Sequence, residues 1–323
     1  MVDEELEQPW AQTPIDPEPY LFVEDESANA PSVPDPVENP NGGSQTNGDD
    51  RAFHQWRLTN VAPQRQEGFC AVFVKVPLGD IRAEEFFALA GIAREFAGGG
   101  ARTTHQQNLV LRWVREESLF DVWRRLADIG LAEAEVHTIT DITACPGTDS
   151  CKLGITSSMG LAGALREALS GDEIIDDPLI RNMHIKMSGC PNSCGQHHLA
   201  NIGFHGAAAK GVGNGNQVPS YEIFLGGAYA EGETRIAKRI RTRVPAKRTP
   251  EALRRMLTHY RENRRGGEPF NDFVDRVGTA GFEESLKDIK VVEPPEGEAL
   301  DLYRDWGKEV LYKVERGEGE CSK

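Results

Sequence analysis

Four cysteines arranged in two short pairs constrain this 323-residue chain more strongly than any other feature of its sequence. Five residues separate Cys145 from Cys151, three separate Cys190 from Cys194, and thirty-eight lie between the two pairs. Proline and glycine adjoin the sulfurs of both pairs, so the backbone can wrap closely around a ligand and point amide N–H groups at it. In a cytoplasmic chain, where disulfides are rare, such pairs indicate a metal site.

Two kinds of site would use four thiolates: an iron–sulfur cluster and a tetrahedral zinc ion. Zinc knuckles usually place their cysteines about two to four residues apart, whereas a cubane is larger and tolerates looser loops. The five-residue spacer therefore favours a cluster over zinc, and unrelated buried cysteines are the third interpretation. Cys70 lies in an apolar stretch and is predicted to be a core residue, and Cys321 has no visible partner.

The acidic charge of the chain is concentrated near its start. Residues 1–50 contain thirteen Asp and Glu, no Lys or Arg, and eight of the nineteen prolines, which leaves 36 basic and 38 acidic residues for positions 51–323. Such a segment repels itself and cannot bury a core, so an acidic, proline-rich disordered tail or linker is predicted over residues 1–50. It would serve as a solvated spacer or, alternatively, as a docking arm for a basic partner.

Hydropathy and charge exclude several classes of protein. No apolar run reaches the roughly 18 residues that a membrane-spanning helix needs, so we expect a soluble, cytoplasmic protein without membrane contact. Between Arg235 and Arg265, twelve Lys and Arg accompany two acids, a local net charge of +10 that suits an acidic partner or only covers a solvated face. No nucleic-acid motif accompanies this run, so no nucleic-acid partner is expected.

Apolar periodicity predicts strands and helices that alternate from residue 69 onwards. Runs of β-branched and aromatic residues predict strands over 69–76, 109–114, 183–187, 200–209 and 221–225. Apolar stripes at helical spacing predict helices over 83–97, 118–129, 157–169, 249–263 and 272–278. The first four elements indicate a small α+β layer, and both cysteine pairs fall in loops of the part that follows.

The sequences around the cysteines resemble a known family. Residues 143–154 (TACPGTDSCKLG) and 188–206 (SGCPNSCGQHHLANIGFHG) are similar to the siroheme and [4Fe-4S] signature of nitrite and sulfite reductases. Residues 102–109 (RTTHQQNL) resemble the siroheme-facing segment of that family's ferredoxin-reductase-like half-domain. Further similarity lies at 224–227, 244–248 and 270–276, so that the resemblance covers about residues 52–280.

The resemblance implies a fold and a domain order. The fold class is α+β, with a ferredoxin-reductase-like half-domain, a small sheet with helices, over residues 51–135. A larger α/β domain that binds siroheme and the [4Fe-4S] cluster follows over 136–280, and a charged C-terminal extension occupies 281–323.

The resemblance also implies an activity and two cofactors, a [4Fe-4S] cluster and siroheme. Cys145, Cys151, Cys190 and Cys194 would bind the cluster, and the sulfur of Cys194 would also bridge to the siroheme iron. A shared thiolate couples the two centres directly, so electrons from a ferredoxin or a similar donor can feed a six-electron reduction. The substrate is a small anion, nitrite reduced to ammonia or sulfite reduced to sulfide, and the run SCGQHH favours nitrite.

Siroheme carries many carboxylates, so its pocket must present donors and cations. By their match to the family's motif, the candidates for this work are Arg102, Thr104, Gln107 and Asn108. Asn192 and Ser193, between the last two cysteines, are candidates for hydrogen bonds to cluster or thiolate sulfur.

No catalytic residue is evident. Lys186 is the one candidate for facing the anion site, although a solvated lysine is the favoured interpretation. His197 and His198 would line the macrocycle or belong to the surface or a supporting layer. His105 lies inside the siroheme-facing motif and would point either to the cofactor or outwards.

The resemblance covers only the C-terminal half of the family's two-half architecture. We expect the substrate-gripping half to come from a separately encoded first half, with a symmetry mate or an inactive truncated product as the alternatives. Two rival functions remain open at this point. One is a non-catalytic [4Fe-4S] electron-transfer or structural subunit without siroheme, and the other is a zinc-stabilised structural domain.

Overall fold

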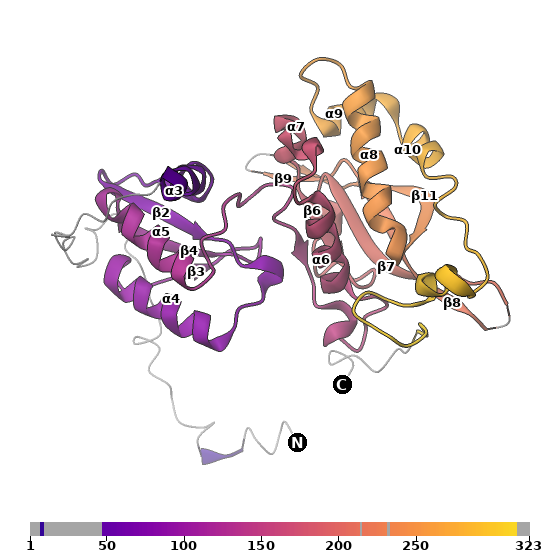
Figure 1. Ribbon diagram of the computed structural model, residues 1–323, viewed down its shortest axis with the longest axis horizontal. Helices are drawn as coiled ribbons and strands as arrows, with labels where there is room; N and C mark the ends of the chain where they lie inside the picture. The colour runs from indigo at the N-terminus through magenta and orange to yellow at the C-terminus, as the bar shows by residue number, and fades with distance from the viewer. Residues whose placement is uncertain (1–6, 10–46, 214, 231–232, 315–323) are drawn as a thin grey trace.

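The computed structural model describes residues 7–9, 47–213, 215–230 and 233–314 and shows two lobes side by side (Figure 1). Most of the acidic segment predicted over residues 1–50 lies outside the described residues, and so does Cys321. Residues 47–50 of that segment form the start of a helix, which continues into the first lobe. None of the helices in the described ranges has the length and apolarity needed to cross a membrane.

The N-terminal lobe is a four-stranded antiparallel sheet packed against three helices. Its strands, in the order β1-β2-β4-β3, are β1 (Val61–Pro63), β2 (Phe69–Val74), β4 (Leu109–Arg115) and β3 (Arg102–Thr103). Its helices are α3 (Asn47–Asn60), α4 (Ala83–Phe96) and α5 (Leu119–Asp128). Apolar residues of β2, β4 and all three helices form one core. The small sheet with helices that the family resemblance implied is therefore present.

Helix α3 was not predicted, because its sequence begins in the acidic, Asn- and Gly-rich segment and consists mostly of polar and charged residues. Several contacts tie it to the lobe. Trp56 is fully buried and packs near Phe53, whose ring contacts Phe120 and Trp123 of α5. Asn60, also fully buried, donates hydrogen bonds to two backbone carbonyl oxygens outside the helix. Tertiary contacts thus hold an otherwise polar helix in place.

The C-terminal lobe is built on a mixed five-stranded sheet in the order β11-β8-β7-β6-β5. The strands are β5 (Thr143–Ala144), β6 (Ile185–Ser188), β7 (Ile202–Lys210), β8 (Gln217–Leu225) and β11 (Lys238–Pro245). Strands β5, β6 and β7 pair in parallel, and β7, β8 and β11 pair antiparallel. A separate two-stranded ribbon consists of β9 (Ala228–Ala230) and β10 (Glu233–Arg235).

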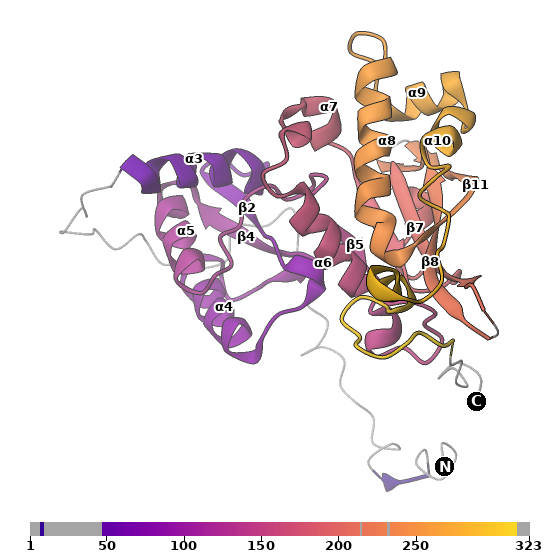
Figure 2. The same cartoon turned by 45° about the vertical axis from the view of Figure 1, so that its right-hand side comes forward.

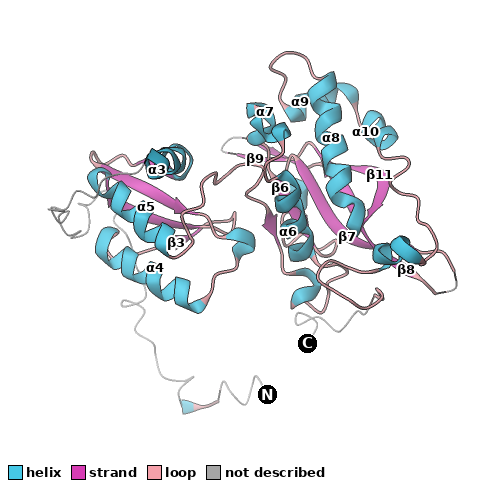
Figure 3. Ribbon diagram, in the orientation of Figure 1, coloured by secondary structure: helices cyan, strands magenta, loops and turns pink. Residues whose placement is uncertain are grey.

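Helices cover this sheet and share the largest core of the molecule. They are α6 (Ser158–Leu169), α7 (Pro178–Arg181), α8 (Thr249–Asn263), α9 (Phe270–Val277) and α10 (Ala280–Ser285). Helices α6 and α8 lie next to each other in front of the sheet in both ribbon views (Figures 1 and 2). Each helix and strand predicted from apolar periodicity is present, with ends displaced by a few residues, as Figure 3 shows by secondary structure.

The basic run from Arg235 to Arg265 forms β11 and α8 rather than a free cationic face. Strand β11 was missed because its sequence alternates exposed Lys and Arg with buried Ile240, Thr242 and Val244. The high density of charge concealed this alternation of exposed and buried residues, which is typical of a strand. Nine of the twelve basic side chains form ion pairs with Asp or Glu. The local net charge of +10 is therefore largely balanced by acids from elsewhere in the fold.

A buried lysine joins the two lobes. Lys75, only 1% exposed, donates from Nζ to the carboxylate of Glu133 at 2.7 Å and to Thr140 Oγ1 at 3.2 Å. Glu133 also pairs with Arg166 of α6 at 2.8 Å, so one carboxylate bridges both lobes. Burial raises the pKa of Glu133, but Lys75 and Arg166 outweigh it and hold the pKa below its ordinary range.

Replacing Lys75 with Met should lower the free energy of unfolding by about 1–2 kcal/mol, because the contacts of Nζ with Glu133, Thr140 and the Ala134 carbonyl oxygen are lost. The apolar part of the Met side chain still fills the site. The lowered pKa of Glu133 means that its stabilising charge is present at neutral pH and is lost as the pH falls through the folded-state value. Acid should therefore destabilise the Lys75→Met variant less than the original protein. Urea unfolding at neutral and acidic pH measures both effects, and an unchanged pH dependence would contradict the bridge.

Candidate functional site

The two cysteine pairs follow two neighbouring parallel strands. Strand β5 leads directly into Cys145, and β6 leads through Gly189 into Cys190. Ala144 of β5 is aligned with Met187 of β6, so both chains leave the sheet at the same edge and at the same level. Because the carboxyl ends of parallel strands lie together, two loops thirty-eight residues apart in sequence become neighbours in space.

Backbone contacts join the two loops directly. The N–H groups of Ile155 and Thr156 both donate to the carbonyl oxygen of Gly189, at 2.8 and 3.1 Å. A Cβ atom placed on Gly189 would lie 2.5 Å from the Cα atom of Gly147 in the other loop. Glycine is therefore required at this crossing, because any side chain would push the two loops apart.

The four cysteines lie on the two loops that meet at this crossing. Cys145 Sγ accepts a hydrogen bond from the Gly189 N–H at 3.1 Å. Burial raises the pKa of the Cys190 thiol, the Asn192 backbone N–H opposes this, and the three other cysteines raise it further. Cys190 therefore lies within electrostatic range of the three other cysteines.

The cysteines differ in their access to solvent. Cys190 is buried and Cys145 is half-buried, whereas Cys151 and Cys194 are exposed. Within the described ranges, no set of three or more His, Cys, Asp or Glu side chains is close enough together to hold a single metal ion. The donor set nevertheless consists of four thiols with backbone N–H groups aimed at sulfur, which is the environment that a multi-iron cluster uses.

A serine and a histidine brace the second loop. Ser188 Oγ accepts the Gly195 N–H at 3.0 Å and is hydrogen-bonded to His197 Nδ1 at 2.9 Å. His197 is fully buried, and among the described residues its Nε2 atom has no hydrogen-bond partner. Burial, reinforced by His198 and His205, lowers the pKa of His197 to about 3, so the ring stays neutral. His197 therefore supports the loop, and Ser193 Oγ is hydrogen-bonded to His198 Nδ1 at 3.1 Å.

The motif predicted to face siroheme forms the turn between β3 and β4 and touches the other lobe. Gln107 has a left-handed backbone, with φ of 67°. Its side-chain amide donates to the Ala144 carbonyl oxygen at 2.7 Å and accepts the Ala144 N–H at 2.9 Å. This amide pairs with the edge of β5 as a strand would, one residue before Cys145. The contacts of Gln107 thus fix the start of the cysteine loop and do not support a role in binding siroheme.

Asn108 is also used within the protein. It is 1% exposed, accepts the Val76 N–H at 2.9 Å and donates to the Asp141 carboxylate at 2.8 Å. Thr104 Oγ1 accepts the Asn108 N–H at 3.1 Å and closes the turn. The Asn108 side chain is therefore bonded within the protein, whereas the Thr104 hydroxyl accepts one bond here and can still donate to a carboxylate. Arg102 lies exposed on β3, where a cofactor could reach it.

Lys186 is not the solvated lysine that the sequence favoured, so that prediction was wrong. It is 4% exposed, and its Nζ donates to Gln196 Oε1 at 2.7 Å. Burial lowers the pKa of Lys186, and Asp141 opposes this. His184 has its pKa lowered by burial and then by His137, Lys186 and other neighbours. The junction of the lobes therefore holds several nitrogen bases with one buried carboxylate.

His105 belongs to the same region. Burial lowers the pKa of His105 most, and the charge of Lys186 lowers it further. The ring of His105 contacts Tyr229 edge to face, with the two ring centres 5.2 Å apart. Sequence reasoning missed Asp141, His137 and His184, since none of them lies in a motif. Asn192, a candidate for a hydrogen bond to sulfur, is exposed and acts on Cys190 through its backbone N–H.

Comparison with known families agrees with this geometry. The model of the nitrite/sulfite reductase ferredoxin-like half domain matches residues 62–129, and that of the nitrite and sulphite reductase 4Fe-4S domain matches residues 135–293. The chain belongs to the nitrite and sulfite reductase family. The predicted family and fold class, a ferredoxin-like half-domain followed by a larger α/β domain, are thus confirmed.

Reductases of both kinds are among the relatives of this chain. A chloroplastic ferredoxin-nitrite reductase of Zea mays is 33% identical over 200 residues, which are 61% of this chain and 34% of that protein. The NADPH sulfite reductase hemoprotein beta-component of Geobacillus thermodenitrificans is 31% identical over 207 residues, 62% of this chain and 34% of that protein. The chain thus spans about a third of the length of these family members.

Solved structures show the same fold. The Mycobacterium tuberculosis NirA protein superimposes with a TM-score of 0.60 at 24% identity, covering 69% of this chain and 41% of that chain. Dissimilatory sulfite reductase I gives a TM-score of 0.54 at 12% identity, covering 75% of this chain and 76% of that chain. At these identities, the comparison supports the architecture alone.

Substituting Asn108 with Ala should lower the free energy of unfolding by about 1–3 kcal/mol in the protein without cofactors, because the buried Val76 N–H and Asp141 carboxylate lose their partner. The matched control is Leu58→Ala, at a side chain 84% exposed in the same lobe, with an expected change within about 0.5 kcal/mol. Urea unfolding measures both. Equal stability of the two variants would show that Asn108 is not a structural tie.

The ring of His197 should not titrate between pH 8 and pH 5, because its pKa is lowered to about 3. Its unfolded form binds a proton near pH 6.5, so the contribution of this residue to stability falls as the pH drops below that value. Nuclear magnetic resonance of the ring protons checks this, with exposed His54 as the internal comparison. A midpoint for His197 close to 6.5 would show that the ring is not enclosed.

Proposed function

We propose that this chain carries the cluster-binding part of a siroheme-dependent reductase that reduces nitrite or sulfite with electrons from a ferredoxin or a similar donor. The observation that supports it best is the crossing of two cysteine loops at one edge of β5 and β6. Relatives of both kinds, nitrite and sulfite reductases, share this part of the sequence. The run SCGQHH favours nitrite, as the sequence resemblance first implied.

Under this proposal, Cys145, Cys151, Cys190 and Cys194 hold the [4Fe-4S] cluster. A cubane separates its ligands more widely than a single ion does, so it suits the five-residue spacer between Cys145 and Cys151. Backbone N–H groups point at the sulfurs of Cys145 and Cys190, as they do at the ligands of iron–sulfur clusters. The cluster, when bound, supplies single electrons for a six-electron reduction. Exposed Cys194 is the sulfur proposed to be shared with siroheme.

The site that binds anionic groups, either the carboxylates of siroheme or the substrate, is proposed to lie at the junction of the lobes. Burial, and after it the charges of Lys186 and His137, lower the pKa of both His105 and His184. An anion bound there would favour the protonated forms of these bases and be attracted by their positive charge. We propose that these bases and exposed Arg102, rather than Gln107 and Asn108, face siroheme carboxylates or the substrate. Further cations are expected from a first half of the enzyme, whether it is part of the same protein, a separate chain or a symmetry mate.

One observation favours a second candidate function. Thr104, Gln107 and Asn108, which the motif assigned to siroheme, are bonded within the protein. A chain that holds a [4Fe-4S] cluster without siroheme, and transfers electrons without catalysis, would need no such contacts. Siroheme adds intense visible absorption that a cluster alone lacks, so the spectrum of anaerobically purified protein separates the two functions.

Changing each of the four site cysteines to Ser should abolish or strongly reduce iron binding, since a hydroxyl is a poor ligand for iron in a cluster. The control is Cys70→Ser, because Cys70 is buried in the other lobe, in strand β2. Iron and acid-labile sulfide are measured in protein purified without oxygen. Zinc without iron, or iron content that survives the loss of any of the four, would overturn the proposal.

A further inference from the structure

Residues 297–314 form a segment, here called the strap, that lies beyond the family match ending at residue 293. It begins with the short helix η7 (Gly297–Tyr303) and continues without regular structure across the lower part of the C-terminal lobe, in yellow in Figure 1. The sequence predicted only a charged extension here. The structure instead places much of it in contact with the first cysteine loop.

The strap is anchored at its start by a small core. Leu302 and Tyr303 are buried against Val218 of β8. The Tyr303 hydroxyl donates to the Glu293 carbonyl oxygen at 2.7 Å and accepts the Val212 N–H at 3.0 Å. These contacts hold the strap on the sheet independently of the cysteines.

A second anchor packs the strap against α6. The Trp306 indole N–H donates to the Ala246 carbonyl oxygen at 3.0 Å, and the Lys247 ammonium group lies 4.4 Å from the ring centre. A Cβ atom on Gly160 of α6 would lie 2.6 Å from Trp306 Cβ. The helix is thus shaped to admit the strap, which indicates a specific contact rather than a loosely attached end.

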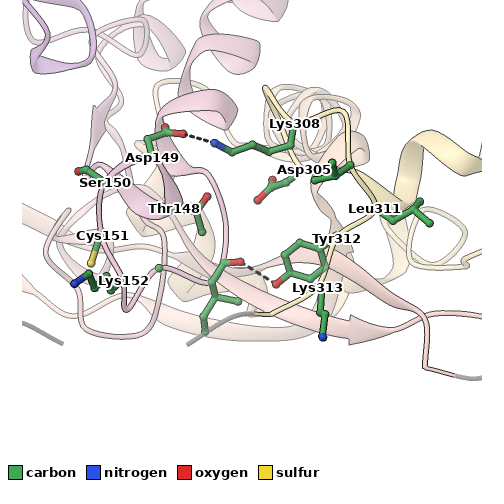
Figure 4. Close-up of a pocket in the computed structure, with 13 residues that line it drawn as sticks. Thr148, Asp149, Ser150, Cys151, Lys152, Asp305, Lys308, Leu311, Tyr312 and Lys313 are labelled. Atoms are coloured by element: carbon green, nitrogen blue, oxygen red, sulfur yellow. Dashed lines mark hydrogen bonds and ion pairs between the residues drawn. The ribbon is translucent and has the colours of Figure 1, made fainter. Parts of the chain in front are cut away.

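Three further side chains of the strap contact the loop that carries Cys151. One of them lies between the two anchors in sequence, and two follow the second anchor. Asp305, 3% exposed, accepts the Ser157 N–H at 2.8 Å, at the start of α6. The Tyr312 hydroxyl donates to the Ile155 carbonyl oxygen at 2.8 Å, and Lys308 pairs with Asp149 at 3.3 Å (Figure 4). Loop and strap together line a cavity of about 420 Å³, and Cys151 is one of its lining residues.

The loop needs such support because it contributes little to the core. Cys151 is exposed, and residues 149–152 are all exposed. A ligand sulfur held on a mobile loop leaves its metal more easily, since each opening of the loop exposes the bond to competing ligands. The contacts of Asp305 and Tyr312 fall at Ser157 and Ile155, where the loop returns to α6.

We propose that Asp305 and Tyr312 are positioning residues, through which the strap holds the Cys151 loop in the geometry that retains a cluster. The inference rests on the proposed function only in that a cluster is bound by the four cysteines. The hydrogen bonds themselves do not depend on it. Two measurements, one on protein without the cluster and one on cluster-loaded protein, therefore test the strap contacts and the retention of the cluster separately.

The test compares the original protein with the double variant Asp305→Ala/Tyr312→Phe. In protein without cofactor, hydrogen exchange of the amides from 148 to 157 should be about tenfold faster in the double variant, because the loop opens more often. In cluster-loaded protein, loss of iron to a chelator under argon should also be about tenfold faster. The single variant Asp305→Asn keeps one acceptor oxygen. Its rates of amide exchange and of iron loss should therefore both lie within about threefold of those of the original protein.

The matched control is Glu309→Ala, an exposed position on the same strap, which should change neither rate. If the double variant fails to fold, the single Tyr312→Phe change, which keeps the ring, should give about a threefold effect. Exchange and iron loss equal to the control would overturn the inference, as would faster exchange with unchanged iron loss. Iron-free original protein would instead refute the proposed function, and the exchange measurement would still decide whether the strap holds the loop.

Discussion

The close contact of two glycines, Gly147 and Gly189, is the constraint on which the candidate site depends. Parallel pairing of β5 and β6 brings both cysteine loops to one edge of the sheet, but pairing alone leaves room for side chains between them. Only the missing Cβ atoms allow the backbones to touch and to exchange hydrogen bonds at Gly189. The two cysteine loops meet because the backbones beneath the sulfurs are packed as tightly as a core.

The two lobes contribute differently to this arrangement. The C-terminal lobe provides all four cysteines, and the N-terminal lobe braces them through the turn between β3 and β4. Gln107 pairs with Ala144, Asn108 reaches Asp141, and Lys75 meets Glu133. These contacts are short, largely buried and made across the junction. They explain how a half-domain without a cysteine of the site can still affect the cysteine loops, through the position of β5.

The electrostatic character of the site follows from burial. Burial raises the pKa of the Cys190 thiol and lowers that of His197 to about 3, whereas Cys151 and Cys194 are exposed. The nitrogen bases near Lys186 lie on the side of the turn between β3 and β4, and the strap lies on the side of Cys151. An electron-transfer centre with an anion on one side and a protein support on the other would have this arrangement.

The sequence alone determined many of the helices and strands, though not α3 or β11, together with the cysteine pairs and the family, because periodicity, spacing and local motifs lie in consecutive residues. Only the tertiary structure decided what Gln107, Asn108, Lys186 and the strap do. Gln107 bonds to a residue 37 positions away, and Asp305 to one 148 positions away. An amide or a carboxylate has the same chemistry beside a cofactor as beside a backbone. Which partner it meets depends on the folding of distant segments, and no local pattern encodes that.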